Sequence, residues 1–201
     1  MCRLLATLAL ASLFLCPAAF AEDSKPADFA DYGVSVGVSP FGGSLSFIYN
    51  ESAKTSWLFG LGGLPSDIVE MKVDVDGTEY TTKASSSWVG LFLNHRPFAS
   101  ATWFRLVAGV GFGNIENELD DGAGNTYSVD YKENPVGYLG LGFGAKAVKG
   151  FFWGVDVGWL QSAGPQITPT AGDGADVADI ADNLFFGSAL PNMQLTLGWG
   201  F

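Results

Sequence analysis

The chain contains a single histidine, His95, so acid–base or nucleophilic chemistry would have to be built around it. Such chemistry needs a nucleophile, a base and a group that orients the base. His95 stands in the stretch HRPF, beside Arg96 and Pro97, where the sequence predicts a short turn. A solvated turn residue is the interpretation that we favour for His95, and we expect no enzyme.

Two charged residues interrupt stretches that are otherwise apolar and rich in glycine. Arg105 lies in WFRLVAGVGFG and Asp156 lies in FFWGVDVGWL, each on the glycine-bearing side of its stretch. Charges withdrawn from water are costly unless they are paired. The sequence therefore predicts that Arg105 and Asp156 interact, directly or through a network. A structural plug is the favoured role for this interior charge pair, and a selectivity or gating element is the alternative.

Aspartates recur at every third position in the acidic segment 171–185. Apolar residues alternate with them at helical spacing, which predicts a short amphipathic helix packed over one end of the fold. The aspartates are Asp173, Asp176, Asp179 and Asp182, and the apolar residues are Val177, Ile180, Ala181 and Leu184. A hard cation needs converging oxygens, so a solvated acidic face is favoured over a metal site. No phosphate loop, zinc spacing or haem motif appears, and we expect no metal and no cofactor.

The elements that position these residues alternate with a period of two, which is typical of β-strands. The alternating segments are 33–39, 44–50, 57–63, 85–94, 103–113, 138–145, 151–160 and 192–201. Each carries an apolar face opposite a face of glycine and small polar residues. Strands of this length suffice to cross a bilayer core when tilted. Alternation alone would also fit a soluble sandwich whose apolar faces meet in a shared core.

The connections between these segments alternate in length. Short ones at 50–56, 94–101 and 146–150 are separated by long polar ones at 64–84, 114–134 and 161–190, and only 39–43 breaks the pattern. Outer-membrane barrels have short periplasmic turns and long external loops. The predicted fold class is therefore all-β: an eight-stranded antiparallel transmembrane β-barrel with its long loops outside.

Aromatic residues cluster toward the short-turn ends of the predicted strands. Trp and Tyr favour the boundary between membrane and water, so we interpret the cluster as an interfacial girdle rather than a core. The chain ends with Leu195, Leu197, Trp199 and Phe201 on one face of its last strand. In a closed barrel this strand must pair with the first. These four residues are predicted to lie at the membrane interface.

Residues 1–21 are predicted to be a secretory signal peptide, followed by one barrel domain over 22–201. Arg3 precedes an apolar stretch from Leu4 to Leu15, and small residues at 19 and 21 fit a cleavage site before Glu22. A transmembrane anchor and a lipoprotein are the disfavoured alternatives. Both cysteines fall in the signal. Loss of Arg3 takes the net charge from −11 to −12, which argues against a nucleic-acid partner.

The mature chain resembles the small eight-stranded outer-membrane barrels of the OmpA-type and OmpW-type group of Gram-negative bacteria. Within that group it is most similar to a set of surface β-barrel proteins without an assigned activity. The stretches that carry the resemblance are NPVGYLGLGFG (134–144), VDVGWLQSAGPQIT (155–168), ADVADIADN (175–183) and residues 191–201. The ending also resembles the assembly signal that the barrel-assembly machinery reads.

The resemblance implies a monomer in the outer membrane, with membrane lipid and lipopolysaccharide around it. Lipid-A-modifying barrels of similar size place a histidine near the outer leaflet, whereas His95 falls at the periplasmic end. The favoured hypothesis is a largely filled barrel with a structural or surface-exposed role, since eight strands enclose little more than their own side chains. A narrow porin for small solutes is the alternative, because inward glycines remove volume. A soluble periplasmic β protein is a distant third.

Overall fold

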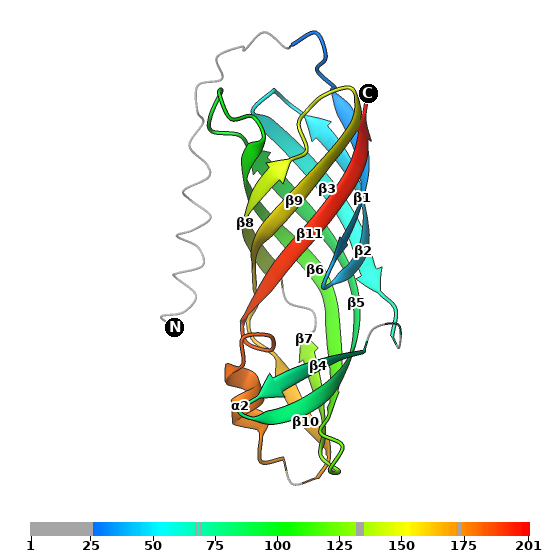
Figure 1. The fold of residues 1–201 in the computed structure, drawn as a ribbon, viewed down its shortest axis with the longest axis vertical. Helices are drawn as coiled ribbons and strands as arrows, with labels where there is room; N and C mark the ends of the chain where they lie inside the picture. Colours follow the sequence, from blue (N-terminus) through cyan, green and yellow to red (C-terminus); the bar gives the residue numbers. More distant parts are fainter. Residues whose placement is uncertain (1–25, 67, 69, 132–134, 173) are drawn as a thin grey trace.

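The computed structural model describes residues 26–66, 68, 70–131, 135–172 and 174–201 (Figure 1). The signal peptide predicted for residues 1–21 and the position of Asp173 lie outside the described residues. The strands are β1 (Tyr32–Ser39), β2 (Gly42–Asn50), β3 (Thr55–Leu64), β4 (Glu70–Val75), β5 (Thr78–His95), β6 (Phe104–Asp120), β7 (Thr126–Tyr131), β8 (Val136–Gly144), β9 (Gly150–Gln161), β10 (Gln166–Ala171) and β11 (Ala189–Gly200). A helix, α2 (Val177–Asp182), precedes the last strand.

Eight strands close into a ring of antiparallel pairs. The order is β1-β2-β3-β5-β6-β8-β9-β11, and β11 pairs again with β1. The closing pair runs from Gly33 opposite Gly200 to Val38 opposite Leu195. A closed ring leaves no strand edge unpaired, which is the condition for sheet structure within a bilayer. The predicted eight-stranded antiparallel barrel is confirmed, and each predicted segment contributes one strand of the ring.

Beyond the ring, five strands form one sheet that we call the extension, in the order β4-β5-β6-β7-β10. β5 and β6, with 18 and 17 residues, run through both parts of the molecule. The ring lies in the upper part of Figure 1 and the extension in the lower part. Residues 64–84, 114–134 and 161–190 connect the strands of the ring as predicted, but they contain strands that were not predicted. The backbone ladder continues through these segments as β4, β7, β10 and the outer parts of β5 and β6.

The extension has a hydrophobic core of its own. α2 falls within the predicted helical segment, and its Ile180 side chain is fully buried against the sheet. Leu184 was predicted on the same apolar face, but it lies beyond the helix and is exposed. The members of the core are Val75, Tyr80, Leu119, Tyr127, Val129, Tyr131, Ile180, Phe186 and Leu190.

The outer surface of the ring is an apolar belt. On β11 the outward residues from Met193 to Phe201 are each more than half exposed. The 12 residues of β11, at about 3.3 Å each and a tilt of roughly 40°, rise about 30 Å, close to the thickness of a hydrocarbon core. Among the described residues, no helix is both long enough and apolar enough to cross a membrane.

The inward face of the ring is packed by large side chains that lie over glycines. A Cβ atom at Gly140 would lie 2.6 Å from the Tyr138 hydroxyl oxygen, and one at Gly62 would lie 2.6 Å from the Trp88 ring. The same relation joins Phe92 to Gly90 and Gly109, Phe152 to Gly198, and Arg105 to Gly142. The sequence suggested that inward glycines leave free volume. At these positions the volume is taken by a neighbouring side chain instead.

Candidate functional site

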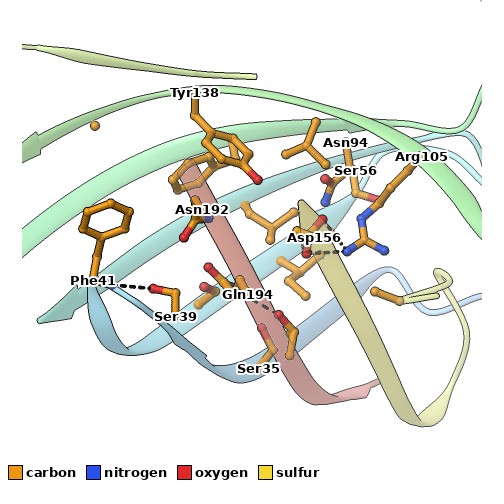
Figure 2. Close-up of a pocket in the computed structure, with 18 of the residues that line it drawn as sticks. Ser35, Ser39, Phe41, Ser56, Asn94, Arg105, Tyr138, Asp156, Asn192 and Gln194 are labelled. Carbon is orange, nitrogen blue, oxygen red and sulfur yellow. Dashed lines mark hydrogen bonds and ion pairs between the residues drawn. The ribbon is translucent and has the colours of Figure 1, made fainter. Parts of the chain in front are cut away.

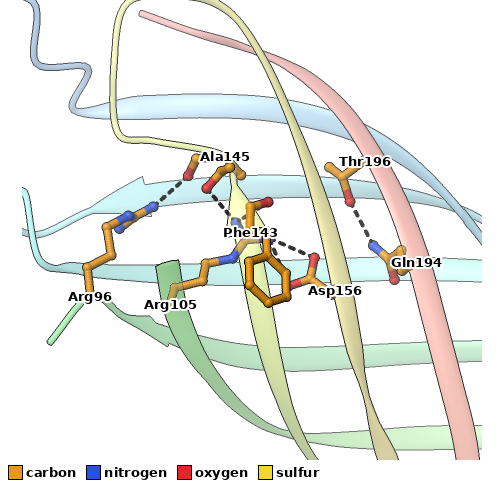
Figure 3. Close-up of polar contacts among 8 residues, drawn as sticks. Arg96, Arg105, Phe143, Ala145, Asp156, Gln194 and Thr196 are labelled. Atoms are coloured by element: carbon orange, nitrogen blue, oxygen red, sulfur yellow. Dashed lines mark hydrogen bonds and ion pairs between the residues drawn. The ribbon is translucent and has the colours of Figure 1, made fainter. Parts of the chain in front are cut away.

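Arg105 and Asp156 meet inside the ring. They lie on β6 and β9, and the register places Gly142 of β8 between them in one row. Arg105 Nη2 donates to both carboxylate oxygens of Asp156, to Oδ1 at 2.8 Å and to Oδ2 at 2.7 Å (Figure 3). A Cβ atom at Gly142 would lie 2.5 Å from Arg105 Nε and from Asp156 Oδ1. The glycine therefore leaves the space in which the two charges make contact.

Arg105 is also held by backbone carbonyl groups at the end of β8. Its Nη1 donates to the Gly144 oxygen at 2.6 Å and to the Phe143 oxygen at 3.3 Å. Gly144, the last residue of β8, and Ala145, the residue after it, both have positive φ, of 74° and 46°. Only 2 % of Arg105 is exposed. The guanidinium group is therefore fixed by one carboxylate and two carbonyl groups.

A second buried arginine, Arg96, was not predicted from the sequence to be an interior charge. It directly follows β5, is 3 % exposed, and reaches across to β3 and to the turn after β8. Its Nη1 donates to Ser56 Oγ at 3.0 Å and its Nη2 to the Ala145 oxygen at 2.6 Å. The inward positions of β5 alternate through Phe92 and Asn94, so Arg96 continues the same face. That parity was the signal that could have found it.

A cavity of about 130 Å³ runs along the interior of the ring. Its lining includes Phe41, in the turn between β1 and β2, and Lys146 and Gly200 at the opposite end. Figure 2 shows Phe41 on one side of the cavity and Arg105 on the other. Uncharged polar side chains line its middle, including Asn94 and Gln194. The predicted filled interior therefore holds only in part, because room for several water molecules remains.

Both ends of this cavity are covered. At the end that carries the short turns, Phe29 forms a β-bridge with Val148, and Ala30 is completely buried. The Asn50 side chain donates to the Ala30 oxygen at 2.8 Å. At the other end the core of the extension lies over the ring, and Phe41 packs against it. We call this cavity inside the ring the chamber.

No family model and no curated protein matches this chain. Several solved structures share its fold. CarO of Acinetobacter baumannii is 15 % identical with a TM-score of 0.67, and CarO2 of the same organism is 16 % identical with a TM-score of 0.69. The chain has the fold of the small eight-stranded outer-membrane β-barrels. The likeness covers 86 % of this chain in both cases, and 98 % and 99 % of the two CarO chains.

A more distant barrel has the same architecture. A major outer membrane protein of Thermus thermophilus is 13 % identical, with a TM-score of 0.51 over 85 % of this chain and 98 % of the other. Identities this low support the fold of this outer-membrane barrel and no particular activity.

The last strand of the barrel lies where the sequence placed it. Leu195, Leu197, Trp199 and Phe201 all point outward and are each more than half exposed. The backbone N–H of Phe201 donates to the Tyr32 oxygen at 2.9 Å, and the reverse bond measures 3.1 Å. The chain end is therefore paired up to its final residue. The role of these four residues as an assembly signal stays a prediction.

His95 is the last residue of β5 rather than a turn residue. Its side chain is exposed, and its Nδ1 lies 3.4 Å from Thr55 Oγ1. Thr55 is the side chain that the structure places at hydrogen-bonding distance from the imidazole of His95. The expectation of no enzyme stays a prediction.

The aspartate row does not form one solvated face. The Asp176 carboxylate turns into the extension, where Oδ2 accepts hydrogen bonds from Tyr80 at 2.5 Å and from Tyr127 at 3.3 Å. Burial, followed by the nearby Asp176, raises the pKa of Tyr80 well above its usual range. Asp179 and Asp182 remain exposed. Asp176 therefore anchors α2 to the sheet, and among the described residues no cluster of three His, Cys, Asp or Glu side chains could hold a metal.

Another acidic residue organises the loop between β6 and β7. The Asp121 carboxylate accepts the backbone N–H groups of Ala123, Gly124 and Asn125, together with the Asn125 side-chain amide at 2.6 Å. These bonds, the Asn125 amide first, hold the pKa of Asp121 below its usual value. Asp121 therefore closes a tight turn and is satisfied without a cation.

Proposed function

We propose that this chain is a monomeric integral protein of the outer membrane of a Gram-negative bacterium, with a closed lumen and a structural, surface-exposed role. The apolar belt would contact membrane lipid, and lipopolysaccharide would surround its outer rim. The end of the barrel that carries the short turns, which we call the turn end, would face the periplasm. The extension would lie outside the cell. Export by the signal peptide and insertion by the barrel-assembly machinery belong to the same proposal.

The observation that carries this proposal is the polar crossing of the lumen. Arg96 spans from β5 to β3 and to the turn after β8, and Arg105 spans from β6 to Asp156 on β9. These side chains are almost fully buried and lie close to the turn end. Buried charges held by several hydrogen bonds are costly to move, so they favour a closed interior.

The extension supports a role at the surface. Its strands are paired with one another and it has a hydrophobic core, so it is a folded sheet rather than a set of loops. Outward residues on β6, such as Glu116 and Glu118, give it an acidic exterior. An apolar belt of this size would be unstable in water, which disfavours a soluble periplasmic protein.

Single cysteines test the placement of the two ends, because the predicted mature chain has no cysteine. Lys72→Cys on β4 should react with a membrane-impermeant maleimide on intact cells. Lys54→Cys, in the turn between β2 and β3, is the matched control and should react only after permeabilisation. Labelling of Lys54→Cys alone on intact cells would reverse the proposed orientation.

A narrow channel for small solutes is the second candidate, and the cavity along the ring favours it. Planar-bilayer recording of the refolded mature chain separates the two candidates. The closed-lumen proposal expects no reproducible conductance steps from heat-modifiable, folded protein. Reproducible steps that change in Arg105→Gln would establish a channel whose path passes the interior charge pair.

A further inference from the structure

The two buried arginines lie side by side. Arg105 Nη1 donates to the Gly144 oxygen and Arg96 Nη2 donates to the next carbonyl oxygen, that of Ala145, both at 2.6 Å. Figure 3 shows both guanidinium groups reaching the end of β8 and the turn after it, Arg96 from just beyond β5 and Arg105 from β6. Two positively charged guanidinium groups therefore donate hydrogen bonds to the carbonyl groups of two consecutive residues.

The charges in this chamber do not balance. The described charged residues that line it are Arg96, Arg105, Lys146 and Asp156, three cations and one anion. Asp156 is committed to Arg105 through both of its oxygens. Arg96 is held by a serine hydroxyl and a carbonyl group, neither of which neutralises its charge. A protein with a net charge of −11 therefore has an interior of the opposite sign.

Each buried arginine also has an N–H group that donates no hydrogen bond to a described residue. Arg96 Nε and Arg105 Nε have no hydrogen-bond partner among the described residues, although both atoms are inaccessible to solvent. A buried charge without a counter-charge is strongly destabilising. An anionic oxygen beside the guanidinium groups would supply both the charge and the acceptor, and charge-assisted hydrogen bonds are about twice as strong as neutral ones.

A route from the turn end reaches this point. A second hollow of about 260 Å³ is lined by Pro26, Ala53, Lys54, Arg96 and Phe98, among others. Arg96 therefore lines both this hollow and the chamber inside the ring. A small solute in this hollow would lie beside Arg96.

We propose that Arg96 and Arg105 form a binding site for a small anionic oxygen group, a carboxylate or a phosphate, at the turn end of the lumen. The anion accepts hydrogen bonds from the two guanidinium groups and supplies the negative charge that Asp156 alone does not. Arg96 exchanges one of its neutral acceptors for the anion when the site fills. The site does not depend on whether the barrel conducts.

The test is the thermal midpoint of the refolded protein in detergent at constant ionic strength. Sodium phosphate and sodium acetate are titrated against sodium chloride, and binding to the folded state alone raises the midpoint with anion concentration. Arg96→Gln keeps a donor for Ser56 but removes the charge, and it should weaken the apparent affinity by roughly tenfold or more. Lys72→Gln removes an equally positive, exposed side chain of the extension and should leave the affinity unchanged.

The three salts separate the possible ligands. A rise with both oxyanions supports a general oxyanion site, and a rise with acetate alone or phosphate alone assigns the ligand to that class. Equal midpoints in all three salts would overturn the proposal, as would an equal loss in Arg96→Gln and Lys72→Gln. If Arg96→Gln does not refold, Asp156→Asn decides, since freeing Arg105 should tighten binding, and an unchanged or weaker affinity would contradict the site.

Discussion

The ring and the extension share two strands, β5 and β6, and the polarity of the outward and inward faces is opposite in the two parts. On β6 the outward residues of the ring, such as Leu106 and Val110, are apolar and exposed, whereas those of the extension, such as Glu116 and Glu118, are acidic. The inward residues change in the reverse sense, from Arg105 and a run of glycines to apolar side chains of the extension core. The same strand therefore faces an apolar medium in the ring and water in the extension, while its side chains keep alternating between the two faces of the sheet.

The change of polarity falls at the same level on neighbouring strands. Val89 of β5 pairs with Phe112 of β6, and both are apolar and exposed. Two residues further out, Ser87 pairs with Asn114, and from there the outward positions are polar. This level marks the outer rim of the belt. Polarity, rather than the end of a strand, therefore shows where the surrounding medium changes from lipid to water.

The largest expected effect comes from truncating one apolar side chain in each part of β6. Leu119→Ala removes a side chain that is 1 % exposed and leaves a cavity in the extension core, so it should cost about 2–5 kcal/mol of local stability. Val110→Ala faces outward, where lipid fills the space, so only the transfer term of roughly 1 kcal/mol is lost. Hydrogen exchange over residues 114–131 measures the first effect.

Chemical unfolding in lipid vesicles measures the second, because the six tryptophans all lie outside the extension and report on the ring. Equal losses in the two variants would mean that both sides of β6 are buried in the same kind of environment. That result would remove the contrast between the ring and the extension.

A charge placed on the outer face of the ring should be more destabilising than a charge placed on the outer face of the extension. Val36 lies in the middle of β1 and is 57 % exposed on the belt, and Val36→Arg should destabilise the ring by about 2–4 kcal/mol in lipid. Glu118→Arg, outward on the extension, should change stability by only about 0.5 kcal/mol or less. Urea titration in vesicles compares both with the parent chain. A Val36→Arg protein of unchanged stability would show that the belt does not contact lipid.

The ring was predictable from sequence because lipid imposes a strict pattern. Each strand of the ring must alternate, and each must be apolar on its outward side, so the eight segments stood out. The interior pair Arg105 and Asp156 followed from the same alternation. The closing of β11 on β1 followed from the requirement that no strand edge stays open in lipid.

The extension was not predictable in the same way, because its strands carry the polarity of a water-soluble sheet. Segments 64–84 and 114–134 appeared as acidic connections once apolar outward faces were taken as the mark of a strand. The contact between Tyr80 and Asp176 joins residues from β5 and the start of α2, and such a contact depends on tertiary packing. Arg96 was missed since it follows the last strand residue, although its side chain still points inward.

A smaller effect is expected when inward glycines are replaced by alanine. The size of the effect should show whether the space beside each glycine is filled or open. Gly142→Ala would push a methyl group to within 2.5 Å of Arg105 Nε and Asp156 Oδ1, and overpacking of this kind costs about 1–3 kcal/mol. Gly111→Ala is the matched control, because its Cβ meets only the Val89 oxygen, at 3.4 Å. Heat-modifiable gel migration and unfolding in vesicles compare the two variants. Equal tolerance of both would show that the ion pair moves freely.

The last expected effect concerns alkaline pH and separates the extension from the ring. Burial and Asp176 raise the pKa of Tyr80 above its value in the unfolded chain. The stabilisation is therefore fully present below the unfolded pKa of about 10 and is lost as pH rises through the folded value. Hydrogen exchange should show the extension loosening above about pH 10 while the ring persists. Tyr80→Phe should reduce this loss of stability. Tyr32→Phe should not, because the Tyr32 side chain is exposed at the turn end of the barrel. Loosening of both parts at the same pH, or an equal response in the two variants, would contradict the assignment to Tyr80.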